Sequence, residues 1–332
     1  MSRLVKFLFE GLPVRGMLVR LTDGWQELLA RRCSSTDDDG ESREFAPEVR
    51  SLVGELVAAG VLMQSNIKFK GALLLQLHGD GPVKLAVAEV QPELSFRATA
   101  TVVGAVPPGA TLEALVNQHG RGRCAITLDP RERLPGQQPY QGVVPLHGDR
   151  REPLQQVQQV LEHYMLQSEQ LDTRLVLAAD DQVAAGLLIQ RLPVQGQGNL
   201  EGQAESLRNE NEIGVNEAYN RIAMLVATLT REELLTLEPE RILHRLFWEE
   251  TLRVFAPDPL AQPRFACSCS RERVRGMLQG LGRDESESLI AERGVVEVGC
   301  EFCGLKYRFD AVDVGAMFTP GRETPPTPGS VQ

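Results

Sequence analysis

Two pairs of closely spaced cysteines in the last quarter of the chain constrain its fold more than any other feature. Cys267 and Cys269 are separated by one residue, and Cys300 and Cys303, about thirty residues later, by two. Such pairs on two short arms are typical zinc ligands. The segment has few apolar side chains and needs a metal to fold, and zinc binding contributes about 10–16 kcal/mol in model peptides. We therefore predict one Zn²⁺ per chain.

The residues around the second pair predict a β-hairpin. Val295–Val298 is expected as a strand and Cys300–Gly304 as a tight turn, after which Leu305, Tyr307 and Phe309 alternate along a return strand. Gly304 tolerates the bend that follows the cysteines. The turn allows both sulfurs to face one ion.

The first pair is closer than in most structural zinc sites, whose cysteines are two or more residues apart. Sulfurs around a tetrahedral zinc lie roughly 3.8 Å apart, against about 2.05 Å in a disulfide, so oxidation within either pair needs only a small movement. A disulfide in so small a loop constrains the unfolded chain little. Oxidation is therefore expected to release the metal and unfold the module. The spacing alone leaves a purely structural zinc site and a redox switch both open.

The composition limits the compartment and the partners. The chain has a formal net charge of −10, which argues against non-specific nucleic-acid binding. Its N-terminus lacks a signal-peptide core, and no apolar stretch approaches the ~18–20 residues that cross a bilayer. We predict a cytoplasmic protein without membrane contact, whose thiols are normally reduced.

Residues 1–192 predict an α+β core domain. Apolar periodicity predicts helices that begin near Pro47 and Pro153. Alternating or continuous apolar runs predict strands at 3–9, 14–21, 67–104 (three strands), 123–128, 140–146, 173–180 and 182–193.

Three further segments follow the core domain. Residues 193–254 predict a metastable helical linker. The first part of this segment is rich in polar residues, and the capping-box spacing of Thr230 and Glu233 then predicts the start of a helix. The segment has enough apolar surface to dock but too little to fold alone. Residues 255–312 are the expected zinc-binding redox-switch domain, and the Pro-rich residues 313–332 a disordered tail.

Other motifs carry weaker alternatives. His78–Asp80 and His147–Asp149 each place a histidine near a carboxylate, but such sequences more often form turns. Gly196–Gly198 lacks the strand and helix of a nucleotide-binding loop, and Asp37–Asp39 is more typical of an exposed acidic loop than of a cation site. We predict no catalytic residues, no enzyme activity and no other cofactor.

A zinc-dependent nucleic-acid binder is the remaining alternative. Arg271–Arg275 is a basic run beside the cysteines, which the negative charge of four thiolates explains adequately. Cys33 and Cys124 are isolated in the sequence, and we assign neither a role.

The segments FACSCSRERV and GCEFCGLKYRF resemble the zinc-binding end of the thirty-three-kilodalton chaperonins, the redox-regulated heat-shock holdases. The family pattern is Cys-x-Cys, a gap of about thirty residues, and Cys-x-x-Cys. The similarity extends over nearly the whole chain, in order through LQLHGDGPVKLAV, YQGVVPL, YMLQSEQLDTRL, AAGLLIQRLP and ELLTLEPERILHRLFWEE. The departures are the acidic 33–45 loop, His78 and the Pro-rich tail, and none of them involves the cysteines.

The resemblance implies an ATP-independent holdase that is inactive while its four cysteines bind zinc. It implies that hypochlorous acid, or peroxide with heat, releases the zinc and forms the disulfides Cys267–Cys269 and Cys300–Cys303. The module and the linker then unfold, the protomers form a homodimer, and unfolded client proteins bind. An apolar stripe of the linker would pack on the core domain when docked and become available on release; it comprises Ile222, Leu225, Val226 and Leu229.

Overall fold

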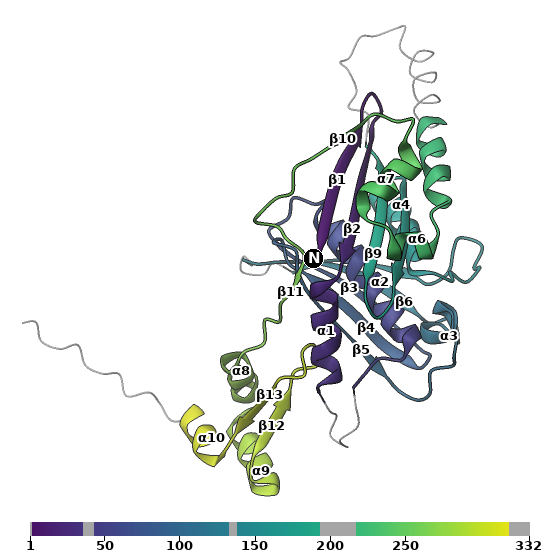
Figure 1. Ribbon diagram of the computed structural model, residues 1–332. Helices are drawn as coiled ribbons and strands as arrows, with labels where there is room; N and C mark the ends of the chain where they lie inside the picture. Colours follow the sequence, from purple (N-terminus) through teal and green to yellow (C-terminus); the bar gives the residue numbers. More distant parts are fainter. Residues whose placement is uncertain (1, 36–42, 133–137, 193–216, 319–332) are drawn as a thin grey trace, which may run out of the picture. The chain divides into compact units, whose positions relative to one another are not determined.

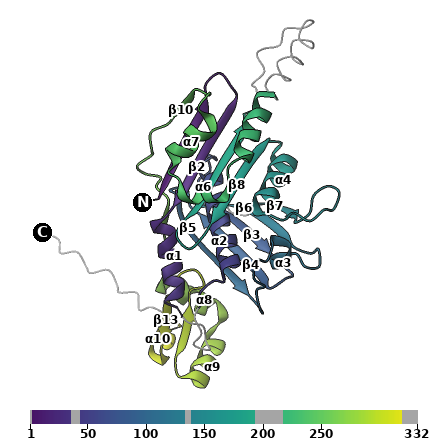
Figure 2. The same cartoon turned by 45° about the vertical axis from the view of Figure 1, so that its right-hand side comes forward.

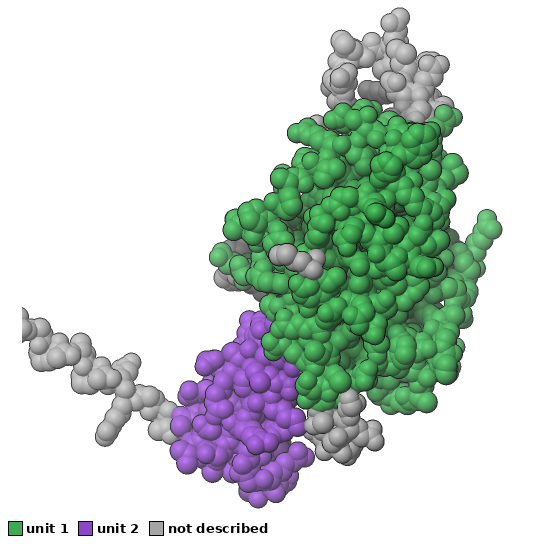
Figure 3. Space-filling model, viewed as in Figure 1, with its two compact units in different colours: residues 1–266 green, residues 267–332 purple. Residues whose placement is uncertain are grey.

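The computed structural model describes residues 2–35, 43–132, 138–192 and 217–318. The chain forms two compact units, Met1–Ala266 and Cys267–Gln332 (Figure 3). Within the described ranges, no helix is long and apolar enough to span a membrane. The four-part division expected from the sequence remains a prediction, and residues 193–216 of the linker lie outside the described ranges.

The first unit contains a five-stranded antiparallel sheet with the order β10-β1-β2-β9-β8 (Figure 1). Its strands are β1 (Arg3–Phe9), β2 (Val14–Leu21), β8 (Thr173–Ala179), β9 (Ala184–Arg191) and β10 (Leu252–Val254). β9 is buried along almost its whole length, as its near-continuous apolar sequence predicts for a central strand.

A six-stranded sheet with the order β11-β5-β4-β3-β6-β7 is the second sheet of this unit. Its strands are β3 (Gly71–His78), β4 (Val83–Val90), β5 (Ser95–Val102), β6 (Arg123–Pro130), β7 (Tyr140–Pro145) and β11 (Arg264–Phe265). All pairings are antiparallel except that of β11 with β5. β3 alternates between more and less buried residues, the period-2 pattern of a strand with one face in the core.

Helix α2 (Pro47–Gln64) contacts strands of both sheets (Figure 2). Most of its side chains are buried, and nearly all of the buried ones are apolar. A Cβ atom on Gly54 would lie 2.3 Å from the Cβ of Ala179 on β8, so glycine permits this close approach. The described residues of the 1–192 segment also form helices α1 (Asp23–Cys33), α3 (Leu112–Val116) and α4 (Val157–Glu169).

The described part of the predicted linker consists of a helical stretch over 217–227, α6 (Arg231–Thr236), α7 (Pro239–Phe247) and β10. Its helices pack against the five-stranded sheet, and β10 is the edge strand of that sheet. The predicted capping box is present: the Thr230 side chain accepts a hydrogen bond from the N–H of Glu233, whose carboxylate accepts one from the N–H of Thr230. We call residues 217–254 the docked segment.

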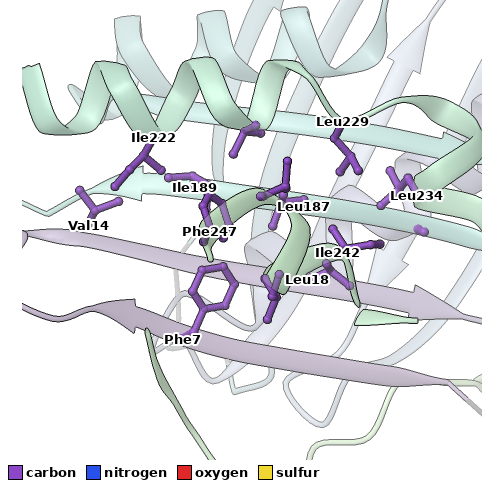
Figure 4. Packing of buried hydrophobic residues seen from close by; sticks show 14 of the residues in the cluster. Phe7, Val14, Leu18, Leu187, Ile189, Ile222, Leu229, Leu234, Ile242 and Phe247 are labelled. Carbon is purple, nitrogen blue, oxygen red and sulfur yellow. The ribbon is translucent and has the colours of Figure 1, made fainter. Parts of the chain in front are cut away.

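The docked segment shares one apolar cluster with the sheet (Figure 4). Ile222 and Val226 of the helical stretch and Ile242 of α7 are fully buried in this cluster. Phe247 of α7 is almost fully buried there. The Phe247 ring lies edge-on to the Phe9 ring, with 5.0 Å between their centroids. Of the predicted stripe, Leu225 is only partly buried.

The second unit is small and contains both helices and strands. It contains α8 (Arg271–Leu281), α9 (Arg283–Arg293), the hairpin strands β12 (Val296–Gly299) and β13 (Lys306–Phe309), and α10 (Ala311–Met317). Its buried apolar cluster has five members, which are Leu278, Val296, Phe309, Val314 and Met317.

Several local features differ from the sequence predictions, and helices α3 and α8 were not predicted. Helix α4 begins at Val157 instead of Pro153, because Gln156 and Gln159 form a capping box and Pro153 instead makes a β-bridge with His147. Residues 313–317, expected in the tail, belong to α10, which Asp310 caps and which contributes to the apolar cluster. The short strands β10 and β11 were not predicted.

Candidate metal centre

The second unit brings the two cysteine pairs together. The sulfur atoms of Cys267, Cys269, Cys300 and Cys303 all lie within 4.8 Å of one another. Two close contacts join the arms, with 3.6 Å between the sulfurs of Cys267 and Cys300 and 3.4 Å between those of Cys269 and Cys303. All four cysteines are free thiols. We call this group the cysteine cluster.

The first arm is held by the start of α8. Ser270 is the N-cap, and its hydroxyl accepts a hydrogen bond from the N–H of Arg273 at 3.2 Å. The guanidinium of Arg273 donates to the hydroxyl of Ser268, between the two cysteines, at 2.8 Å. These bonds fix the backbone on both sides of Cys269.

The second arm is the turn of the predicted β-hairpin. The N–H of Cys300 donates to the carbonyl of Leu305 at 2.9 Å, and the N–H of Gly304 donates to the carbonyl of Cys300 at 2.8 Å. Gly304 has a φ of +70°, the left-handed conformation that glycine adopts without strain. The turn therefore directs the sulfurs of Cys300 and Cys303 to the same side.

The thiols influence one another's ionisation. The hydrogen bond from the thiol of Cys300 lowers the pKa of Cys267, and the same bond raises the pKa of Cys300. Burial raises the pKa of Cys303. The metal-free cluster thus forms one thiolate easily and further ones only with difficulty, since the negative charges repel one another. A bound cation would remove this penalty.

The cysteine cluster fits a zinc ion by its chemistry and its spacing. Four thiolates are a soft donor set that Zn²⁺ takes in tetrahedral sites, with Zn–S distances of about 2.3 Å and sulfurs about 3.8 Å apart. The separations of 3.4 and 3.6 Å between the arms are close to that value, and all four sulfurs lie within 4.8 Å of one another. The group can therefore hold a metal ion.

The basic run beside the first arm binds protein groups. Arg271 makes an ion pair with Asp313 at 2.7 Å, and its guanidinium lies over the ring of Phe309, 4.3 Å from the centroid.

Sequence reasoning missed a contact of the cysteine cluster, in which the hydroxyl of Tyr307 donates a hydrogen bond to the sulfur of Cys269 at 3.2 Å. The alternation of residues along β13 was the available signal, because it placed Tyr307 two residues from the core residue Phe309.

The weaker motifs have structural roles in the first unit. Asp80 accepts hydrogen bonds from the backbone N–H groups of His119 and Arg121 and thereby stabilises a turn. His147 makes a β-bridge with Pro153, and an Oδ atom of the exposed Asp149 lies 3.9 Å from Nε2 of His163. Residues 37–39 and 196–198 lie outside the described ranges.

The two remaining cysteines belong to the first unit. Cys33 ends α1 and is exposed, whereas Cys124 on β6 is completely buried. Burial raises the pKa of Cys124 to about 12. Neither belongs to the cysteine cluster.

Comparisons with known proteins agree with this architecture. The sequence profile of the family described as "Hsp33 protein" matches residues 2–310. The 33 kDa chaperonin of Chromobacterium violaceum is 44% identical, over 96% of this chain and 94% of that protein. The 33 kDa chaperonin of Methylobacillus flagellatus is 38% identical over the same shares.

A solved structure supports the fold. The crystal structure of the 33 kDa chaperonin (heat shock protein 33 homologue) of Thermotoga maritima superposes with a TM-score of 0.69 and 19% identity, covering 96% of this chain and 98% of that one. The class of protein that these matches define is a chaperone, not an enzyme. The chain belongs to the Hsp33 family.

Proposed function

We propose that this chaperone is a redox-controlled, ATP-independent holdase, whose reduced, inactive form binds one zinc ion through Cys267, Cys269, Cys300 and Cys303. The observation that carries the proposal is the convergence of four thiol sulfurs within 4.8 Å of one another, in a unit whose apolar cluster has five buried members. When bound, zinc holds the two arms together and supplies folding energy that so small a core lacks.

Oxidation of the cysteine cluster removes the metal ligands. Two thiolates and one peroxide form a disulfide and two hydroxide ions, because the two electrons released by the sulfurs break the O–O bond. Disulfide sulfurs no longer act as thiolate ligands, so the unit loses its metal and its fold.

The proposed disulfides are Cys267–Cys269 and Cys300–Cys303, within the arms, although close sulfur contacts of 3.6 and 3.4 Å also join the arms. In a tetrahedral arrangement all pairs of sulfurs are nearly the same distance apart, so small differences in distance do not determine which sulfurs form disulfides. Loop closure favours the short loops once the unit loosens, since a closed loop of about three residues costs less entropy than one of about thirty.

Unfolding of the second unit acts on the docked segment through the chain itself. Cys267 directly follows Ala266, whose N–H donates to the carbonyl of Phe96 on β5 at 3.0 Å. β11 has only two residues and adds little stability of its own. We infer that it detaches when the second unit unfolds, and that the docked segment is then released.

Release would expose the apolar side chains that now face the five-stranded sheet, together with the sheet residues that they cover. Such a surface binds apolar segments of unfolding proteins and also a second copy of the chain. The proposed partners are therefore unfolded client proteins and, after oxidation, a second protomer. A protein of this kind belongs in the cytoplasm, where thiols are kept reduced until an oxidant arrives.

The test follows zinc and client holding together. The reduced full-length chain is treated with peroxide at elevated temperature, zinc release is measured with a chromogenic chelator, and light scattering records aggregation of a heat-unfolded client. We expect about one zinc released per chain, with aggregation suppressed only after release. Cys300→Ser removes one ligand and should abolish tight zinc binding, whereas the exposed Cys33→Ser is the matched control and should behave like the wild type.

Two outcomes contradict the proposal. Zinc that remains bound under oxidation, or zinc release without any gain in client holding, would make the cluster a purely structural site.

A further inference from the structure

Two thiol–thiol contacts join the arms of the cysteine cluster, Cys267 with Cys300 and Cys269 with Cys303. Cys269 has a further partner outside the cluster, because its sulfur accepts a hydrogen bond from the hydroxyl of Tyr307, at 3.2 Å. A substitution can remove this bond without altering the backbone.

The hairpin aims the Tyr307 hydroxyl at the first arm. Tyr307 pairs with Val298 across the two strands, and its ring packs against the apolar cluster of the second unit. Its neighbours Lys306 and Arg308 lie on the opposite face, where both bind Glu297 at 2.9 and 2.6 Å. Packing thus fixes the ring, and the bond joins the first arm to the hairpin that carries the second.

A hydrogen bond to a thiolate withdraws electron density from the sulfur. This makes the sulfur a weaker nucleophile and stabilises a ligand set with four negative charges. Groups that orient or hydrogen-bond metal ligands commonly change metal affinity 10–100-fold when they are removed.

We propose that Tyr307 is a positioning residue that protects Cys269 from oxidants and strengthens metal binding, and so sets how much oxidant the cluster withstands. The inference rests on the zinc site of the proposed function, but it concerns one donor and one sulfur. It is tested without reference to client holding.

The test uses Tyr307→Phe in the full-length chain, which keeps the ring and removes the hydroxyl. Cobalt(II) is the probe of the metal-bound form, because a tetrathiolate cobalt site has a sulfur-to-metal charge-transfer band that reports thiolate electron density. We expect this band to move to lower energy and the competition-measured affinity for zinc to fall about tenfold. Iodoacetamide should alkylate Cys269 several-fold faster, with the other three cysteines changed little, as peptide mass spectrometry resolves.

Val298→Ala is the matched control. It trims the cross-strand partner of Tyr307 and weakens the hairpin but leaves the hydroxyl in place. A merely structural role would give Tyr307→Phe the same signature as this control: an unmoved charge-transfer band and equal changes at all four cysteines. That result would overturn the inference.

The inference and the proposed function can fail separately. A wild-type chain that forms a tetrathiolate cobalt site but holds no client refutes the holdase and leaves the role of Tyr307 intact. A wild-type chain that forms no such site refutes the zinc switch, and selective alkylation of Cys269 in the metal-free chain then decides whether Tyr307 protects it.

Discussion

Replacement of Ile222 by alanine loosens the docked segment without touching the cysteine cluster. Ile222 is fully buried and lies near Val14 and Ile189 of the sheet (Figure 4). Within the described residues 217–227 of its helix, the only other buried side chains are Tyr219 and Val226, so docking of this helix depends on the face that carries Ile222. Loss of the side chain should weaken the docking of the helix more than it lowers the stability of the sheet.

The expected loss of docking free energy follows from the burial of Ile222. Truncation of a fully buried isoleucine to alanine costs 2–5 kcal/mol, from lost transfer energy and the cavity left behind. A cost of about 3 kcal/mol that falls on local docking raises the population of the undocked segment roughly 100-fold, because about 1.4 kcal/mol corresponds to a factor of ten.

Hydrogen exchange of the reduced full-length chain measures this effect. Amides in 217–227 that exchange through local opening should exchange roughly 100-fold faster, and those of β2 and β9 should change much less. If docking keeps the chaperone inactive, the variant should also suppress client aggregation before any oxidation.

Met224→Ala is the control on the same helical stretch, because this side chain is 66% exposed. Equal exchange rates in the two variants would refute the reasoning, since Ile222 would then not hold the helical stretch on the sheet.

Three further predictions concern titration, thiol reactivity and metal removal. Burial raises the pKa of Glu55 on α2 from 4.5 to about 7, so the native state retains a proton that the unfolded state loses, and stability falls as pH rises from about 4.5 to 7. Glu55→Gln should therefore stabilise the first unit above pH 7 by up to about 3 kcal/mol, with the gain absent below pH 4, as denaturant unfolding measures. Iodoacetamide at pH 8 should label the exposed Cys33 and spare the buried Cys124 until the first unit unfolds, as mass spectrometry records. A strong chelator under reducing conditions should remove exchange protection from the 296–309 hairpin while β1 and β2 keep theirs.

A specific experimental result would contradict each of these three predictions. A pH-independent difference between Glu55→Gln and the wild type would mean that the carboxyl is ionised normally. Rapid labelling of Cys124 in the folded chain would mean that β6 opens locally, and a hairpin that keeps its protection without metal would mean that the apolar cluster suffices.

The sequence predicted the elements whose signals are local. Strands such as β3 follow from alternation, and α6 follows from the capping box at Thr230 and Glu233. The cysteine cluster was predictable because two close cysteine pairs with this spacing are typical of zinc sites.

The unpredicted features depend on partners distant in sequence. β10 and β11 have three and two residues and pair with β1 and β5, so no periodicity marks them. The bond from Tyr307 to Cys269 spans 38 residues and depends on how the hairpin meets the first arm. The start of α4 was misplaced because Pro153 is a plausible first-turn residue, and only the side chains of Gln156 and Gln159 reveal the true cap.

The pairing of β10 with β1 has a consequence for synthesis on the ribosome. Phe9 and Leu252 are partners across the sheet but lie about 240 residues apart in the chain. At about 5–20 residues per second, roughly 12–50 s separate their translation. Throughout that interval the outer edge of β1 has no strand to pair with, and unpaired edges are sites of aggregation. The nascent chain therefore needs protection of the kind that the finished protein gives to others.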